Sequence, residues 1–152
     1  MTKTEKYEEL LPEIQSVIEG ETDGIANMAN VAAMLHEAFG FWWTGFYRVI
    51  TPDDSQEELL VLGPFQGPLA CTRIKKCRGV CGTSWNEERT VVVPNVHEFP
   101  GHIACSSASN SEIVVPVFHD SKVVAVLDID RKDFSTFDEV DRLYLEKLVS
   151  ML

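Results

Sequence analysis

Apolar residues recur with helical spacing at both ends of the chain, and this periodicity constrains the fold more than any other feature. Residues 4–19 place apolar side chains at every third or fourth position. A second segment of this kind begins after Asp23, which suits an N-cap, and stops at Gly40. A third starts at the capping-box pattern Ser135–Asp138 and runs to the end of the chain. The sequence therefore predicts two helices at its start and one at its end.

Between these helices, short β-branched segments bounded by turns predict strands. The predicted strands are residues 42–50, 58–62, 90–93, 112–118 and 122–130. The sequence TPDDSQ separates the first two, and His119-Asp120-Ser121 separates the last two, so both pairs are expected to be hairpins. We therefore expect one α+β domain over residues 1–152, with a central, mostly antiparallel sheet and the N- and C-terminal helices packed on one side.

The charge of the chain argues against two classes of partner. The 152 residues include 13 Lys and Arg against 24 Asp and Glu, a net charge of −11. Such a surface repels phosphate backbones and anionic lipids, so neither nucleic acid nor membrane is an expected partner. The N-terminus lacks the features of a signal peptide, and no apolar stretch approaches the roughly 18 residues of a membrane span. We expect a cytoplasmic protein.

All four cysteines lie in one long, loop-like middle segment, between Gly63 and Ile113. They are Cys71, Cys77, Cys81 and Cys105. A single cytosolic cysteine is usually a small buried hydrophobe. Four together in a segment that is otherwise mostly loop point instead to catalytic or redox chemistry, because cytosolic thiols are kept reduced and long loops are usually functional.

The local sequence distinguishes the four thiols. Cys81 lies in RGVCGTSW, where a tight turn and a following short helix over 83–88 would place the thiol at a helix N-terminus beside basic residues. Both effects are expected to lower the pKa of Cys81. Cys105 lies in a polar loop of small residues and should be accessible, as a nucleophile requires. Cys77 has the least distinctive surroundings.

A zinc site is the alternative use of these residues. The candidate ligands would be Cys71, Cys77, Cys81, Cys105, His97 and His102. No paired CxxC spacing occurs, so neither a metal nor another cofactor is expected, and a zinc-binding interaction module remains a rival interpretation. His97 and His102 could assist proton transfer near Cys105, although an ordinary loop role is favoured.

Acidic and aromatic residues on the predicted strands could complete a site. Asp128 and Asp130 alternate along the last strand and should share a face, which Glu112 could join from the neighbouring strand. Carboxyls that share protons in this way can act as general acids. Trp43 and Tyr47 share a face of the first strand. Without the cysteines, these residues would be read as a polar strand end and as core.

Several ungapped blocks resemble one known family along essentially the whole chain. They are WTGFYRV, GPFQGPLACTRI, RGVCGTSW, VVVPNVHEFPGHIAC, SASNSEIVVPVF and VLDIDR. The chain resembles the GAF-domain free methionine-(R)-sulfoxide reductases, and three of its cysteines match in spacing. A GAF-like fold and reduction of free methionine sulfoxide are what the resemblance implies. A sensing GAF domain without enzymatic activity is the alternative.

The same resemblance implies residue roles. Cys105 matches the nucleophile that attacks the sulfoxide sulfur, and Cys71 and Cys81 match the recycling cysteines, in an order that stays open. The pocket residues of the family match Trp43, Tyr47, Glu112, Asp128 and Asp130. Ser106 replaces an aspartate of the family, and Cys77 matches none of its cysteines. Thioredoxin is the implied reductant, and the terminal helices could either pair into a homodimer or cover the sheet.

Overall fold

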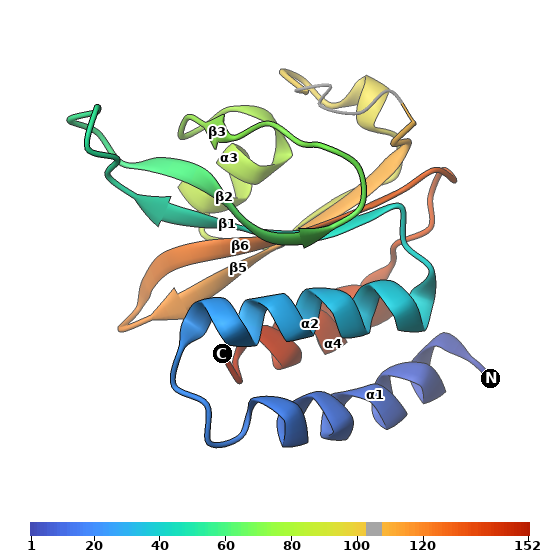
Figure 1. Cartoon of the computed structure of the whole chain (residues 1–152). Coiled ribbons are helices and arrows are strands. Elements are labelled where there is room, and N and C mark those ends of the chain that lie inside the picture. Colours follow the sequence, from blue (N-terminus) through green and yellow to red (C-terminus); the bar gives the residue numbers. More distant parts are fainter. Residues whose placement is uncertain (103–107) are drawn as a thin grey trace.

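A six-stranded antiparallel sheet forms the centre of the protein (Figure 1). The computed structural model describes residues 1–102 and 108–152. The strands are β1 (Trp43–Ile50), β2 (Leu59–Gln66), β3 (Arg73–Ile74), β4 (Val91–Val93), β5 (Ser111–His119) and β6 (Lys122–Arg131). Their order across the sheet is β3-β2-β1-β6-β5-β4, and both predicted hairpins, β1–β2 and β5–β6, are confirmed.

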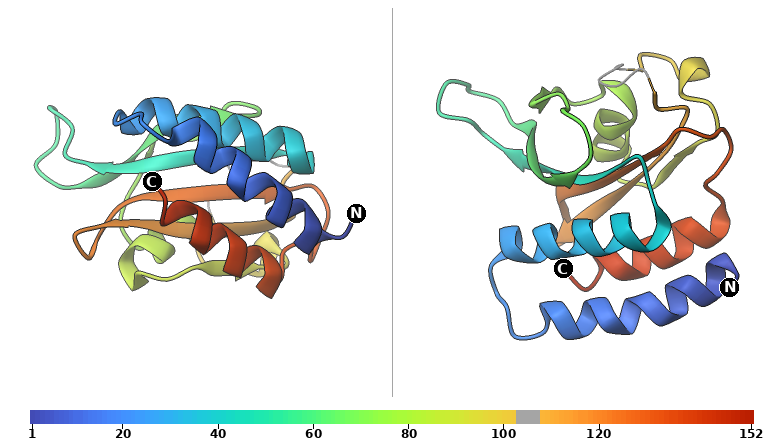
Figure 2. Two further views of the ribbon diagram at one scale, coloured as in Figure 1. Left: turned by 90° about the horizontal axis from the view of Figure 1, so that it is seen from below. Right: turned by 45° about the vertical axis from the view of Figure 1, so that its right-hand side comes forward.

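In the described part of the chain, three helices lie on one side of the sheet and one on the other. The helices are α1 (Lys3–Ile18), α2 (Gly24–Phe39), α3 (Gly79–Glu87) and α4 (Glu139–Val149), with a 3-10 turn η1 (Val96–Glu98). Figures 1 and 2 show α2 and α4 against the sheet and α1 as an outer layer over both of them. The helix α3 covers the opposite face, so the expected α+β architecture with terminal helices on one side is confirmed. Among the described residues, no helix has the length and apolar character needed to cross a bilayer.

The strand alternation divides the interior into two apolar cores. Ile113 and Val115 point toward the terminal helices, whereas Val114 between them points toward α3. Asp128 pairs with Val114 across the β5–β6 ladder. The face that α3 covers is therefore the face that carries the acidic residues of β6.

The helix ends explain where the predictions succeed and where they are wrong. Asp23 caps α2, and Gly40 ends it in a left-handed conformation with φ of 65°, both as predicted. The capping box of α4 starts at Asp138 rather than ending there: its carboxylate accepts from the backbone of Asp141, whose side chain accepts in return. The helix α4 also ends at Val149, short of the chain terminus.

The middle segment holds more regular structure than its sequence predicts. The strand β2 extends to Gln66, and β3 follows a short loop. The helix α3 begins at Gly79, earlier than the predicted start at Thr83. Val80, Gly82 and Trp85 are all buried, which leaves little of the amphipathic period that reveals a helix in a sequence.

Candidate active site

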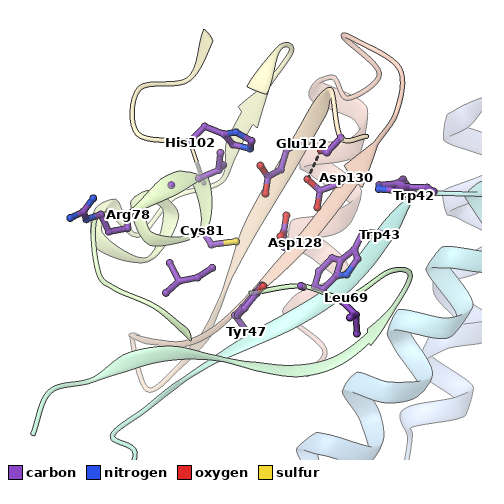
Figure 3. Close-up of a pocket in the computed structure, with 15 residues that line it drawn as sticks. Trp42, Trp43, Tyr47, Leu69, Arg78, Cys81, His102, Glu112, Asp128 and Asp130 are labelled. Atoms are coloured by element: carbon purple, nitrogen blue, oxygen red, sulfur yellow. Dashed lines mark hydrogen bonds between the residues drawn. The ribbon is translucent and has the colours of Figure 1, made fainter. Parts of the chain in front are cut away.

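A pocket opens between α3 and the sheet face that α3 covers (Figure 3). It encloses about 60 Å³ of space, enough for several water molecules. An aromatic group, an acidic group and one thiol line it: Trp42, Trp43, Tyr47, Glu112, Asp128, Asp130 and Cys81. These residues come from four separate elements, which the fold brings together.

The register of three strands aligns the acidic group. Asp130 pairs with Trp43 on β1 and with Glu112 on β5, and Asp128 lies two residues along the same face of β6. The predicted common face of the two aspartates is thereby confirmed. In Figure 3 the three carboxyl groups and the sulfur of Cys81 point toward one another.

The aromatic wall is rigidly held. The ring centroids of Trp43 and Tyr47 lie 6.0 Å apart in a stacked arrangement, and Phe65 stacks on the other side of Trp43 at 5.3 Å. The indole Nε1 of Trp43 donates to the carbonyl of Pro68 at 3.0 Å, and the hydroxyl of Tyr47 donates to the carbonyl of Cys71 at 2.9 Å. The two aromatic residues therefore also fix the chain segment that borders the pocket.

Burial and mutual repulsion make the three carboxyls reluctant to ionise. Burial, followed by the charges of the neighbouring aspartates, raises the pKa of Glu112 well above its ordinary value. The pKa of Asp130 is raised well above its ordinary value for the same reasons, beginning with burial. Burial also raises the pKa of Asp128, although hydrogen bonding with Glu112, Cys81 and Asp130 opposes the rise. Asp128 is thus the member that most readily carries the negative charge of the group.

Cys81 lies in the first turn of α3, as predicted, but its predicted acidity is wrong. Its side chain is 4% exposed, and burial raises the pKa of the thiol well above its ordinary value. The charges of Asp128 and Glu112 raise the pKa further. These contributions outweigh the helix dipole and the basic neighbours that the sequence suggested.

The other cysteines occupy different surroundings. Cys71 is half-buried at the edge of the pocket and is disulfide-bonded, whereas Cys77 is exposed and carries a free thiol. The predicted nucleophile Cys105, like Ser106, lies outside the described residues.

Several pocket residues were not among the predicted site residues, although His102 was considered for proton transfer near Cys105. His102 lines the pocket, where burial lowers the pKa of its imidazole, whereas His97 is exposed and hydrogen-bonds Asn110. The hydroxyl of Ser109 donates to Asp130 at 2.9 Å. Arg78, at the N-cap of α3, also lines the pocket. For Ser109 and Arg78, only their closeness in sequence to cysteines could have drawn attention to them.

Comparison with known proteins shows which family the chain belongs to. The GAF domain family matches residues 28–151. GAF domain-containing protein A of Dictyostelium discoideum is 52% identical, over 99% of this chain and 92% of its own length. The free methionine-R-sulfoxide reductase of Escherichia coli is 42% identical, over 100% of this chain and 89% of its own length. The structure of free methionine-R-sulfoxide reductase from Neisseria meningitidis in complex with its substrate superposes with a TM-score of 0.94 at 54% identity, covering 99% of this chain and 88% of that one. The chain belongs to the GAF-domain free methionine-R-sulfoxide reductase family.

Membership in the free methionine-R-sulfoxide reductase family confirms the resemblance read from the sequence. Six of the eight residues predicted for the site line one pocket: Trp43, Tyr47, Cys81, Glu112, Asp128 and Asp130. Cys71 borders it through the hydrogen bond that its carbonyl accepts from Tyr47. The chemical roles of these residues remain predictions.

Proposed function

We propose that this protein reduces free methionine-R-sulfoxide to methionine in the pocket between α3 and the sheet. The observation that carries the proposal is that three buried carboxyls, two of them with strongly raised pKa values, face an aromatic wall in one pocket of a chain of this family. Sulfoxide reduction requires a proton for the departing oxygen and a surface for the methyl group, and the two halves of the pocket supply them.

Each part of a free amino acid has a complementary group in the pocket. The stacked rings of Trp43 and Tyr47 suit the methyl on sulfur, and the Asp128 carboxylate suits the ammonium group. The substrate carboxylate can meet the first backbone N–H groups of α3, whose N-cap residue, Arg78, makes no side-chain cap. Helix N-termini favour anions at such positions. A peptide-bound methionine lacks both charges, so recognition of this kind selects the free amino acid.

The protons that reduction consumes are held by the acidic group. Glu112 and Asp130 have the most strongly raised pKa values, so they hold their protons to a higher pH than ordinary carboxyls do. A protonated carboxyl beside the sulfoxide oxygen can donate as the sulfur is attacked.

The proposed cycle balances with two thiols and one reductant. The Cys105 thiolate attacks the substrate sulfur, the oxygen passes to the cysteine as sulfenic acid with the donated proton, and methionine leaves. A second thiol displaces water from the sulfenic acid and forms a disulfide. Thioredoxin reduces the disulfide by exchange and becomes oxidised itself.

Cys71 is the better candidate for the second thiol. Cys81 is buried, and its raised pKa disfavours the thiolate that must attack the sulfenic acid. Cys71 is already disulfide-bonded, while the thiols of Cys77 and Cys81 are free. We therefore propose that the Cys71 thiol is the first to attack the sulfenic acid and that Cys81 acts later or not at all.

The substrate class is tested by NADPH- and thioredoxin-coupled turnover on the R and S epimers of free and of peptide-bound methionine sulfoxide. We expect turnover on the free R epimer alone, and a loss of at least about 1,000-fold in Cys105→Ser. Tight binding of small molecules without any turnover would favour the sensor interpretation instead.

The order of the cysteines is tested by mass spectrometry after one turnover without reductant. Wild-type protein and Cys81→Ser should both contain an intramolecular disulfide and release one equivalent of methionine. Cys71→Ser should release methionine but hold a sulfenic acid that a dione reagent traps. Cys77→Ser is the control, since that thiol is exposed and free, and a disulfide lost in Cys81→Ser but kept in Cys71→Ser would reverse the order.

A further inference from the structure

Three donor atoms of different chemistry converge at the floor of the pocket. The sulfur of Cys81 and one carboxylate oxygen each of Glu112 and Asp128 all lie within 4.8 Å of one another, and all three residues are buried. The set differs from the cysteine and histidine combination considered from the sequence. It arises because α3 places its first turn over the ends of β5 and β6.

A second observation points to a ligand at this place. The Oδ1 atom of Asp128 is buried and has no hydrogen-bond partner within residues 1–102 and 108–152. Asp128 as a whole is only 7% exposed and faces the pocket. A buried carboxylate oxygen without a partner is costly, and a bound cation or donor satisfies it.

We propose that Cys81, Glu112 and Asp128 form a binding site for a thiophilic divalent cation of the zinc type, which occupies the pocket in place of an organic ligand. Zinc accepts thiolate and carboxylate ligands together and commonly takes three from the protein while leaving one position open. The lining residue Leu69 is exposed, so the pocket reaches the surface there and offers an entry path for the ion and its fourth ligand.

The separation of the donors suits this ion after a small contraction. Bond lengths to zinc of about 2.0–2.3 Å in tetrahedral geometry place ligand atoms roughly 3.3–3.8 Å apart. Since the three donors lie within 4.8 Å of one another, they need to approach by at most about 1–1.5 Å, which side-chain rotation of Glu112 can supply.

The thiol determines which cations the site accepts. Magnesium and calcium require oxygen ligands and gain little from sulfur, whereas zinc and cadmium bind thiolate strongly. Selection should therefore follow thiophilicity and not charge.

The site overlaps the proposed position of the substrate ammonium group, since Asp128 serves both. Zinc and methionine sulfoxide should consequently exclude each other, a statement that rests on the proposed function. Binding of the ion itself does not, so the two can be tested separately.

The binding experiment uses the full chain with the disulfide of Cys71 intact, in which Cys77 and Cys81 are the free thiols among the described residues. Zinc affinity is measured by competition with a chromophoric chelator, and cadmium is added to record sulfur-to-metal charge-transfer absorption. We expect one equivalent of zinc, a cadmium–thiolate band, and no displacement of zinc by excess magnesium.

Three variants decide the outcome. Cys81→Ser should abolish the cadmium band and weaken zinc binding at least about 10-fold, and Glu112→Gln should weaken it similarly while keeping the band. Cys77→Ser, which removes the exposed thiol, should match the wild type. Zinc affinity that is unchanged in both pocket variants, or a band that is lost in Cys77→Ser, would overturn the proposal. Circular dichroism checks that each variant is folded.

Competition is then measured at equilibrium by displacing zinc with free methionine sulfoxide. Displacement of zinc by methionine sulfoxide would support both proposals, because it shows that the two ligands compete for one pocket. Zinc binding without turnover on any methionine sulfoxide would refute the proposed function and leave the metal site standing, whereas turnover without zinc binding would do the reverse.

Discussion

Glu112 is a residue whose protonation ties stability to pH in an unusual direction. An exposed carboxylate that gains a cationic partner on folding stabilises the native state more as the pH rises. The pKa of Glu112 is instead raised in the folded protein, by burial and by the charges of Asp128 and Asp130. The folded state then holds a proton that the unfolded chain has lost, and the free energy of unfolding falls as the pH rises from about 4.3 toward the raised pKa.

We expect Glu112→Gln to remove much of this pH dependence. Glutamine mimics the protonated carboxyl and cannot ionise, so the variant should gain stability relative to wild type as the pH increases from 4 to 8. Urea unfolding at several pH values measures the difference. Glu13→Gln, on the exposed face of α1, should follow the wild-type curve. Parallel curves for wild type and Glu112→Gln would show that the carboxyl ionises freely in the folded protein.

At the scale of elements, the wall of the pocket depends on a glycine in β1. A Cβ atom built on Gly45 would lie 2.4 Å from the Cβ of Phe65 and 2.6 Å from the end of the Trp43 indole. Gly67 leaves room for another part of the same ring, since a Cβ atom built on Gly67 would lie 2.9 Å from Cδ1 of Trp43. The stacked position of Trp43 therefore exists because Gly45 in β1 and Gly67, directly after β2, carry no side chain there.

We expect Gly45→Ala to push the Trp43 ring out of its stacked position and into the pocket. The KM for free methionine sulfoxide should rise roughly 10-fold, and stability should fall by about 1–3 kcal/mol. Steady-state kinetics and the near-ultraviolet circular dichroism of the tryptophans report these changes. Gly24→Ala is the matched control, because a Cβ there meets nothing within 4 Å. An unchanged KM in Gly45→Ala would show that the position of the Trp43 ring does not determine substrate binding.

The strands show which parts of the fold and of the site can be predicted from the sequence. The strands carrying Asp128 and Trp43 were recognisable because period-two alternation marks one face of a sheet. The order of strands, which aligns Trp43 with Asp130 and Glu112, depends on pairing between distant segments and leaves no local signal. The predicted acidity of Cys81 is wrong for the same reason, since the carboxyls that raise its pKa lie on strands far along the chain.

At the scale of the whole molecule, the N- and C-terminal helices contact each other on the side of the sheet away from the pocket. The helices α1 and α4 lie side by side in Figure 2. The hydroxyl of Tyr7 donates to Oδ1 of Asp141 at 2.6 Å, and the ammonium of Lys3 lies 2.7 Å from Oδ2. Both Tyr7 and Asp141 are buried. This buried polar contact explains why α1 stays attached although it lies outside the first layer of helices.

We expect Tyr7→Phe to destabilise the protein by about 1–3 kcal/mol, because it leaves a buried carboxylate oxygen without its donor while keeping the ring packed against Phe39. For a chain of this size, the midpoint of thermal unfolding should fall by roughly 2–10 °C. Tyr144→Phe is the control: it removes a solvent-exposed hydrogen bond to Glu8, and should change stability by less than about 0.5 kcal/mol. Since the pocket lies across the sheet, turnover by folded Tyr7→Phe should equal that of wild type. Equal stability of the two variants would mean that apolar packing alone holds α1 in place.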